Sequence, residues 1–138
     1  MADKEFRLIV LTQEKAVIDR QVVSVTAPGS EGYLGIWKDH APLVTALQPG
    51  KLSVKPDATH EIDYAISGGY LEVSGNRVTI LADSLEEIES IDLDRAHAAL
   101  KRAQERMHTM ESELDKDRLE YALQRAKNRV RLAEMQNR

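Results

Sequence analysis

The sequence predicts an N-terminal antiparallel β-sandwich or flattened barrel followed by a C-terminal antiparallel two-helix hairpin. Two observations carry this prediction. All 7 glycines and all 4 prolines of the 138-residue chain lie at or before Gly75, which confines the turns to the first part of the chain. The charge changes near the same place, because residues 1–90 hold 8 basic and 14 acidic side chains whereas residues 91–138 hold 11 and 9. We therefore expect two modules, residues 1–86 and residues 87–138.

Short apolar runs separated by turn residues indicate the strands of the first module. Residues 61–66 alternate apolar and polar side chains, as a strand with one solvated face does. Ser74-Gly75-Asn76 has the composition of a hairpin turn. No helical pattern separates the runs, which favours an antiparallel sandwich or barrel. The expected strands are residues 6–11, 23–26, 52–54, 61–66, 70–73 and 78–81.

Apolar residues spaced alternately by four and three positions predict two helices in the second module. Asp92 is the expected N-cap of the first helix, and Asp115 or Asp117 is the expected N-cap of the second. The connection expected at residues 111–115 is short, so the helices should run antiparallel. Alanine-rich seams bury little area, so the hairpin should need a partner or its own sandwich to stay closed. The seams are Ala96, Leu100, Ala103, Met107 and Met110, and Leu119, Leu123, Ala126, Val130 and Ala133.

The composition removes several classes of function. The chain has no cysteine, which excludes a disulfide scaffold, a thiolate metal site and a cysteine nucleophile. A net charge of −4 with 1 Trp and 1 Phe argues against a nucleic-acid-binding protein. No apolar run is long enough for a transmembrane segment, and the first residues do not resemble a secretory signal. A hydrolase built around His40 is disfavoured, because the chain has neither a nucleophile elbow nor a metal-binding histidine spacing.

Four segments in order resemble one known family. They read SEGYLGI at residues 30–36, HAPLVTAL at residues 40–47, SGGYLEV at residues 67–73 and NRVTILAD at residues 76–83. Their order and spacing resemble the epsilon subunit of bacterial F-type ATP synthase. The resemblance covers essentially the whole chain, including the order of sandwich and helical hairpin.

The resemblance implies a rotor subunit without catalytic activity of its own and with no required cofactor. In this family the sandwich packs on the gamma subunit and touches the polar loops of the c-ring, at the cytoplasmic face of the cell membrane. The helical hairpin lies folded, or extends into the alpha/beta head and blocks ATP hydrolysis. Glu31 and His40 would then be partner contacts. Their alternative interpretations are a solvated carboxylate and a loop histidine that is hydrogen-bonded within the fold.

A regulatory ATP site is implied in the hairpin. IDLDRA at residues 91–96 resembles the motif of epsilon subunits that bind ATP as a regulator. Several guanidinium groups on neighbouring helices suit a polyphosphate, which they can bind through paired hydrogen bonds. The alternatives are helix capping for Asp92 and, for the arginines, a basic surface that meets acidic loops of the beta subunit. The candidate ATP-binding residues are Glu86, Asp92, Arg95, Arg102, Arg125 and Arg129.

One alternative function comes from a different class. A stand-alone β-sandwich adaptor with a helical dimerisation hairpin would have the same two modules. It would form a homodimer and would not need a gamma subunit. Purification with gamma separates the two hypotheses.

Overall fold

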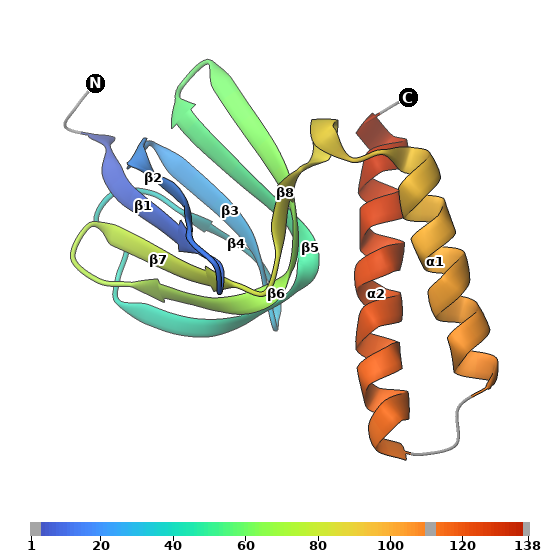
Figure 1. Cartoon of the computed structure of the whole chain (residues 1–138). Coiled ribbons are helices and arrows are strands. Elements are labelled where there is room, and N and C mark those ends of the chain that lie inside the picture. Colours follow the sequence, from blue (N-terminus) through green and yellow to red (C-terminus); the bar gives the residue numbers. More distant parts are fainter. Residues whose placement is uncertain (1–3, 110–112, 137–138) are drawn as a thin grey trace. The chain divides into compact units, whose positions relative to one another are not determined.

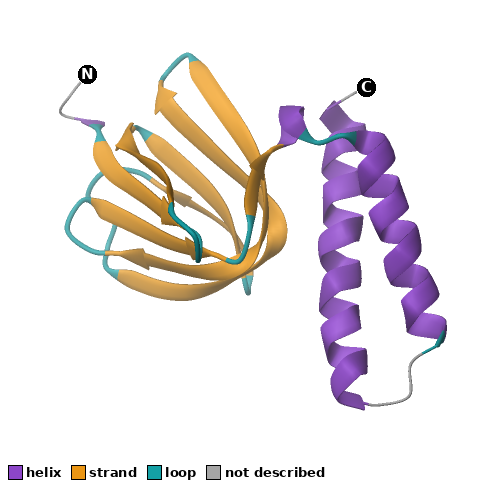
Figure 2. Ribbon diagram, in the orientation of Figure 1, coloured by secondary structure: helices purple, strands orange, loops and turns teal. Residues whose placement is uncertain are grey.

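The computed structural model describes residues 4–109 and 113–136, and the chain divides into two compact units, Met1–Glu87 and Ile88–Arg138. Strands make up the first unit, and the two long helices belong to the second (Figure 2). Each unit is therefore described by itself.

The first unit is a single sheet that folds over on itself without closing (Figure 1). The strand order is β2-β1-β7-β6-β5-β3-β4, and β8 pairs with β6. β1 and β7 are parallel, whereas the other paired strands are antiparallel. The strands are β1 (Phe6–Leu11), β2 (Ala16–Val22), β3 (Ser24–Gly29), β4 (Gly32–Ile36), β5 (Leu43–Asp57), β6 (His60–Val73), β7 (Arg77–Ala82) and β8 (Leu85–Glu87).

Two long strands join the two layers of the sandwich. β5 and β6 pair along most of their length and curve from one layer into the other (Figure 1). The sequence predicted short strands here, at residues 52–54, 61–66 and 70–73, and this prediction was wrong, because β5 and β6 run through these positions without a break. Pro49 lies opposite Ser67, and Gly50 lies opposite Ile66, so both strands bend at the same level and continue. Glycine and proline mark a corner of the sheet here.

Two glycines of this corner have no room for a side chain. Gly69 has a φ of +140°, and a Cβ atom there would lie 2.0 Å from the carbonyl oxygen of Leu81 on β7. At Gly50 a Cβ atom would lie 2.7 Å from the Tyr33 hydroxyl. That hydroxyl accepts a hydrogen bond of 2.9 Å from the backbone N–H of Lys51. The glycines let neighbouring strands and side chains approach the backbone at the corner.

Aliphatic side chains from both layers fill the core. Along β1 and β7 every second residue is buried, which is the alternation that a strand with one buried face requires. The core is built without tryptophan, and Phe6 is its largest fully buried side chain. Its largest fully buried aliphatic members are Leu8, Val10, Val22, Val25, Ile36, Leu52, Val54, Ile66, Leu71, Val78 and Ile80.

A side-chain pair connects two loops at one end of the sandwich. Asp39 and Asn76 are the described non-glycine residues with positive φ, at 65° and 58°. The Asn76 Oδ1 atom accepts from the Asp39 backbone N–H at 2.8 Å, and Asn76 Nδ2 donates to Asp39 Oδ1 at 3.1 Å. The Asn76 carbonyl also accepts from the backbone N–H of Arg7 at 3.1 Å. The pair holds the loop after β4 against the β6–β7 turn.

The second unit consists of a short 3-10 helix and an antiparallel pair of helices (Figure 1). They are η2 (Ile88–Ser90), α1 (Leu93–His108) and α2 (Glu113–Gln136). Asp92 is confirmed as the N-cap of α1, since its side chain accepts a hydrogen bond of 3.2 Å from the Arg95 backbone N–H. α2 begins at Glu113, so the predicted caps at Asp115 and Asp117 were wrong.

The predicted apolar seams coincide with the less exposed positions of the two helices. Ala96 on α1 and three residues of α2, Ala126, Val130 and Ala133, are buried. Leu100, Ala103, Met107, Leu119 and Leu123 are partly buried. The expected seam position Met110 and the first two residues of the expected connection, 111 and 112, lie outside the described residues.

Candidate functional site

The candidate ATP-binding residues lie on different elements. Glu86 is on β8, in the first unit, where it pairs with Ala65. The other candidates belong to the second unit. Asp92 caps α1, Arg95 and Arg102 are exposed on α1, and Arg125 and Arg129 are partly buried on α2.

One contact establishes the register of the two helices. The Nε2 atom of His97 lies 3.1 Å from the Oε1 atom of Glu134, which joins the first turns of α1 to the last turns of α2. Five residues further along α1 is Arg102, and five residues back along α2 is Arg129. These two arginines are therefore level in the antiparallel pair. If the connection centres near residues 112–114, the sequence predicts Arg102 level with Arg125 to within about one helical turn, and the register set by this contact lies within that range.

The four candidate arginines lie along one side of the hairpin. Successive helical residues are rotated by about 100°. On α1, Arg95 and Arg102 each stand one position before a seam alanine, Ala96 or Ala103. On α2, Arg125 and Arg129 stand one position before Ala126 and Val130. In an antiparallel pair the residues that precede the seams project to one common side. We call this side the arginine edge.

The opposite side carries the His97–Glu134 contact. His97 stands one position after Ala96, and Glu134 stands one position after Ala133. Their contact across the helices confirms that residues following the seams share a side. Lys127 follows Ala126 and also belongs to this side. The hairpin thus has an arginine edge and, opposite to it, an edge closed by a histidine and a carboxylate.

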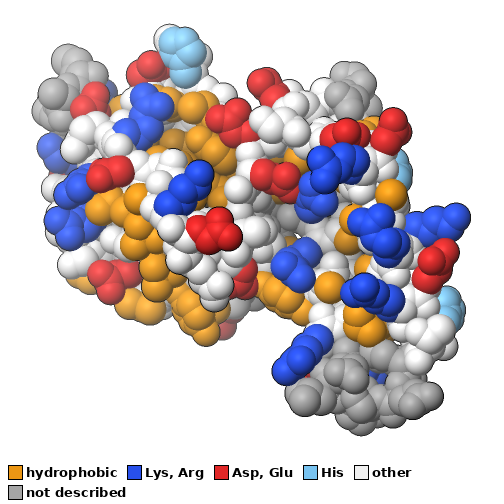
Figure 3. Space-filling view, viewed as in Figure 1, with side chains coloured by type: hydrophobic (Ala, Val, Ile, Leu, Met, Phe, Trp, Pro, Cys, Tyr) orange, Lys and Arg blue, Asp and Glu red, His pale blue; other side chains and the backbone are white. Residues whose placement is uncertain are grey.

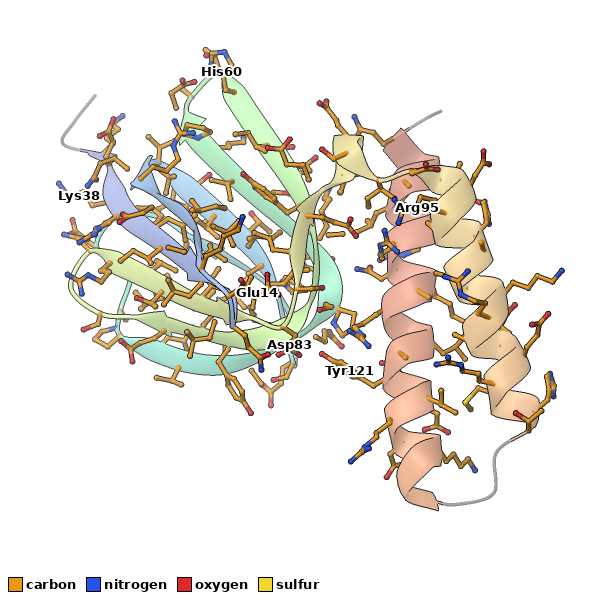
Figure 4. All side chains as sticks on the ribbon, viewed as in Figure 1. Glu14, Lys38, His60, Asp83, Arg95 and Tyr121 are labelled. Carbon is orange, nitrogen blue, oxygen red and sulfur yellow. The ribbon has the colours of Figure 1, made fainter. Side chains whose placement is uncertain are left out.

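Sequence reasoning missed one residue of the arginine edge, Tyr121. The Arg125 guanidinium carbon lies 5.2 Å from the centre of the Tyr121 ring, one turn earlier on α2. A cation over an aromatic face is attracted by the negative face of the ring. Figure 4 shows Tyr121 on α2 and Arg95 on α1. The four-residue spacing of tyrosine and arginine was the signal that could have revealed the pair.

The two candidate partner contacts, Glu31 and His40, lie at opposite ends of β4. Glu31 is exposed in the two-residue turn between Gly29 and Gly32. His40 is partly exposed in the loop after β4, and its Nδ1 atom lies 2.7 Å from the Ala41 carbonyl oxygen. A five-residue strand separates its ends by about 14 Å. The two residues therefore form separate contact points.

An outward-facing apolar row crosses the sandwich. Tyr70 on β6 lies opposite Leu81 on β7 and opposite Ala46 on β5, and Leu81 lies opposite Leu11 on β1. Tyr70 is 61% exposed and Leu81 is 53% exposed. Nearby on β5, Val44 is 71% exposed. Figure 3 shows apolar side chains over β6 and β7 on the viewed face of the sandwich. Large apolar side chains on adjacent strands form a continuous surface that is typical of a protein interface.

Two aspartates of the sandwich, Asp57 and Asp19, have pKa values below the ordinary aspartate range. His60, at the tip of the β5–β6 hairpin (Figure 4), contacts Asp57 through Nδ1 at 2.9 Å. This contact and hydrogen bonds from the Thr59 backbone and hydroxyl lower the pKa of Asp57 far below its usual range. The paired hydrogen bonds from Arg7 at 3.0 and 2.9 Å lower the pKa of Asp19.

Within residues 4–109 and 113–136, no three histidine, aspartate or glutamate side chains are grouped in a way that could hold a metal ion. In the same part of the chain, neither helix combines the length and the apolar character that crossing a membrane requires.

Each of the two units matches a domain of one known protein family. Residues 5–88 match the family described as ATP synthase, Delta/Epsilon chain, beta-sandwich domain, and residues 89–134 match its long alpha-helix domain. The chain is 44% identical over 112 residues to the ATP synthase epsilon chain of Desulforamulus reducens, covering 81% of this chain and 84% of that relative. It is 48% identical over 107 residues to the epsilon chain of Carboxydothermus hydrogenoformans, covering 78% of each.

Solved structures show the same architecture. A chain of the Euglena gracilis mitochondrial ATP synthase, in a structure of OSCP/F1/c-ring, superposes with a TM-score of 0.76 at 25% identity, covering 90% of this chain and 78% of that one. A chain of the Tetrahymena thermophila central stalk and c-ring has a TM-score of 0.61 at 20% identity and 96% coverage of both, which shows the shared fold. With both domain families matched in order, this chain belongs to the epsilon-subunit family of F-type ATP synthases, the non-catalytic subunits of the central stalk.

Proposed function

We propose that this subunit couples ion translocation to ATP synthesis in the stalk, that its hairpin inhibits ATP hydrolysis when extended, and that ATP binding to the closed hairpin relieves this inhibition. The observation that carries the proposal is the arginine edge. Arg102 and Arg129 are level on neighbouring helices, and Arg95 and Arg125 project to the same side. Only the closed hairpin brings these four cations together.

A triphosphate suits this edge chemically. Guanidinium groups bind phosphate oxygens through two parallel hydrogen bonds, and the charge on each partner strengthens those bonds. Like charges one turn apart, as at Arg125 and Arg129, repel each other, and an anion between them removes that repulsion. The sequence has no P-loop, so we propose regulation by bound ATP without its hydrolysis. Asp92, the N-cap of α1, completes the proposed set of ligand-binding residues in the second unit.

In this proposal ATP shifts the hairpin toward its closed form because ATP binds only that form. A ligand that binds only the closed form stabilises it by about 2.7 kcal/mol at a hundredfold excess over Kd. The population of the extended form, which we propose enters the alpha/beta head, falls accordingly. Inhibition of hydrolysis should therefore weaken as ATP rises.

Calorimetric titration of the intact chain with ATP tests the site. Arg102→Ala and Arg125→Ala each remove charge-assisted hydrogen bonds and should weaken binding by roughly 1.5–3 kcal/mol. Lys127→Ala is the matched control, since it removes a cation of α2 from the edge opposite to the arginines. If the parent chain gives no heat with millimolar ATP, or if Lys127→Ala costs as much as Arg125→Ala, the proposed site is wrong. The arginines would then be better explained as a surface for the beta subunit.

We further propose that the outward-facing apolar row is the surface that binds the gamma subunit. Tyr70, Leu81 and Val44 are all more than half exposed, although each belongs to a strand of the core. Glu31, at the tip of a tight turn, is the proposed contact with the polar loops of the c-ring. Together these contacts would hold the subunit peripherally at the cytoplasmic face of the membrane.

Association with purified gamma tests this surface. Tyr70→Arg and Leu81→Arg should each weaken a one-to-one complex by about thirtyfold, the loss of about 2 kcal/mol expected at a central interface residue. Val17→Arg is the control, since Val17 is 38% exposed on β2, outside the row. All three should unfold near the parent temperature, because exposed substitutions change stability little. A homodimer without affinity for gamma would instead support the adaptor hypothesis.

A further inference from the structure

We propose that Arg106 is a further phosphate-binding residue of the hairpin and that it completes an array of arginines for the triphosphate of ATP. This inference rests on the proposed ATP site, and it names the part of the ligand that the site recognises. Arg106 stands one position before the seam residue Met107, so it belongs to the arginine edge. Its side chain is exposed in the last turn of α1. The arginine array consists of Arg102 and Arg106 on α1 and Arg125 and Arg129 on α2.

Each helix contributes two arginines that are four residues apart. On α1 the pair is Arg102 and Arg106, and on α2 it is Arg125 and Arg129. Four residues advance a helix by about 6 Å and rotate it by about 40°, so the members of a pair project to the same side. Like charges at this spacing repel each other. An anion bound between the two pairs would remove this repulsion within both helices at once.

The register of the hairpin brings the two pairs to about the same level. Nine residues after His97 on α1 is Arg106, and nine residues before Glu134 on α2 is Arg125, so the two arginines are level. Long helical side chains lean toward the N-terminus of their helix, so they lean in opposite directions in an antiparallel pair. Arg106 therefore leans from the level of Arg125 toward that of Arg129. A register shift of one turn would still leave Arg106 within about one turn of Arg125.

Arg95 lies farther from the array than Arg106 does. It stands seven residues before Arg102, which corresponds to about 10 Å along α1. In the same register Arg95 is level with Gln136, seven residues after Arg129 on α2. Arg106 is thus closer to the arginines of α2, although only Arg95 belongs to the motif that suggested the site.

Arg125 supplies an observation that points to a ligand. Its Nε atom is buried and has no hydrogen-bond partner within residues 4–109 and 113–136. The guanidinium carbon lies 5.2 Å from the centre of the Tyr121 ring, and a guanidinium that stacks on a ring still presents N–H donors in its own plane. No position three or four residues from Arg125 carries an acid. A buried donor without an acceptor costs free energy, which an anionic oxygen at this edge would remove.

Arg118 provides a matched control for Arg106. It stands one position before the seam residue Leu119, so it also belongs to the arginine edge, and it is exposed. It lies seven residues before Arg125, about 10 Å nearer to the connection. In the register of the hairpin its level is beyond His108, the last residue of α1. Arg118→Ala therefore removes one positive charge from the same edge and leaves the array intact.

The experiment titrates the full-length chain with ATP and with inorganic tripolyphosphate in a calorimeter, at one fixed salt concentration. Tripolyphosphate should bind to the parent chain and compete with ATP, because the array recognises phosphates. Arg106→Ala should weaken the binding of both ligands roughly 10- to 150-fold, the effect of losing charge-assisted hydrogen bonds. Arg118→Ala should weaken it by less than about twofold, since charges about 10 Å apart are largely screened at ordinary salt.

Circular dichroism without ligand separates a binding role of Arg106 from a structural one. Arg106→Ala removes the repulsion with Arg102, so the helix content should stay equal to that of the parent or rise. A variant that binds both ligands weakly with its helices intact supports the array. A loss of helix content in Arg106→Ala would make its effect structural and would overturn the proposal.

The remaining outcomes separate the array from the ATP site. If Arg102→Ala and Arg125→Ala weaken ATP binding but Arg106→Ala does not, the array is wrong and the ATP site stands. Equal effects of Arg118→Ala and Arg106→Ala also overturn the array, because the edge then attracts anions by its total charge alone. The same holds if the parent binds ATP but not tripolyphosphate. If the parent binds neither ligand, both proposals fail.

Discussion

Gly69→Ala should destabilise the sandwich far more than Gly75→Ala, although both glycines have positive φ and belong to the same β6–β7 hairpin. Gly69 lies within β6 with a φ of +140°, and an added methyl group would stand 2.0 Å from the carbonyl oxygen of Leu81. Gly75 lies in the β6–β7 turn with a φ of +54°, and no atom lies within 4 Å of its missing side chain. Comparing the two variants separates two costs. Both variants carry the backbone strain of a positive φ, and only Gly69→Ala also carries a steric collision.

The magnitudes follow from these two environments. A carbon atom approaches a carbonyl oxygen to about 3.3 Å at closest, so β6 and β7 must separate locally by about 1.3 Å. This weakens the ladder around Gly69 and Ala82, where each hydrogen bond has a net worth of about 0.5–1.5 kcal/mol. The unfavourable φ of an alanine in place of Gly69 adds about 1–3 kcal/mol. We expect a loss of about 3–5 kcal/mol for Gly69→Ala and about 1 kcal/mol for Gly75→Ala.

Urea and thermal unfolding of the full-length chain, followed by a signal from the sheet, measure both variants. For a domain of this size, 1 kcal/mol corresponds to about 4–8 °C in Tm. Gly75→Ala should therefore unfold within about 8 °C of the parent. Gly69→Ala should lose at least about 12 °C or show no cooperative transition. Equal losses in the two variants would refute the collision argument and leave φ as the whole cost.

Three further outcomes are expected. Residues 1–87 alone should unfold cooperatively on heating, because the strands of this unit supply their own core, and a gradual transition would contradict this independence. Asp92→Ala should cost about 1 kcal/mol of helix stability through loss of the N-cap, whereas Asp92→Ser keeps the cap; if ATP binding falls in both variants, the carboxylate itself contacts the ligand. The depressed pKa of Asp57 stabilises the fold above the ordinary aspartate range, and this contribution is lost as the pH falls below about 5. Asp57→Asn should therefore flatten the decline of the urea midpoint between pH 5 and pH 2, and an unchanged slope would contradict the assignment.

Features that depend on local chemistry could be predicted from the sequence. The cap at Asp92, the apolar seams and the β6–β7 turn each depend on a few neighbouring residues, and the structure confirms them. The family was recognisable because several motifs stand in order at the expected spacing. Helix caps and apolar helix faces are predictable because each is formed by residues that are close together in the sequence.

Features that depend on distant pairing could not be predicted. Pro49 and Gly50 have the composition of a break between strands, and only their pairing with Ser67 and Ile66 shows that they form a bend. The opposition of His97 and Glu134 depends on the register of two helices, which seam spacing alone leaves uncertain by about a turn. The start of α2 was also missed, because the charged residues before Leu119 continue the helix instead of capping it.

The bent strands have a mechanical consequence for a subunit of the central stalk. In a sandwich of two separate sheets, twisting the molecule can slide one layer over the other along the plane where their side chains meet. Here β5 and β6 run through both layers as continuous polypeptide, paired with each other around the corner. Sliding would have to shear the backbone hydrogen bonds of that corner as well as the apolar contacts of the core. The sandwich should therefore resist twisting more strongly than a sandwich of two separate sheets would.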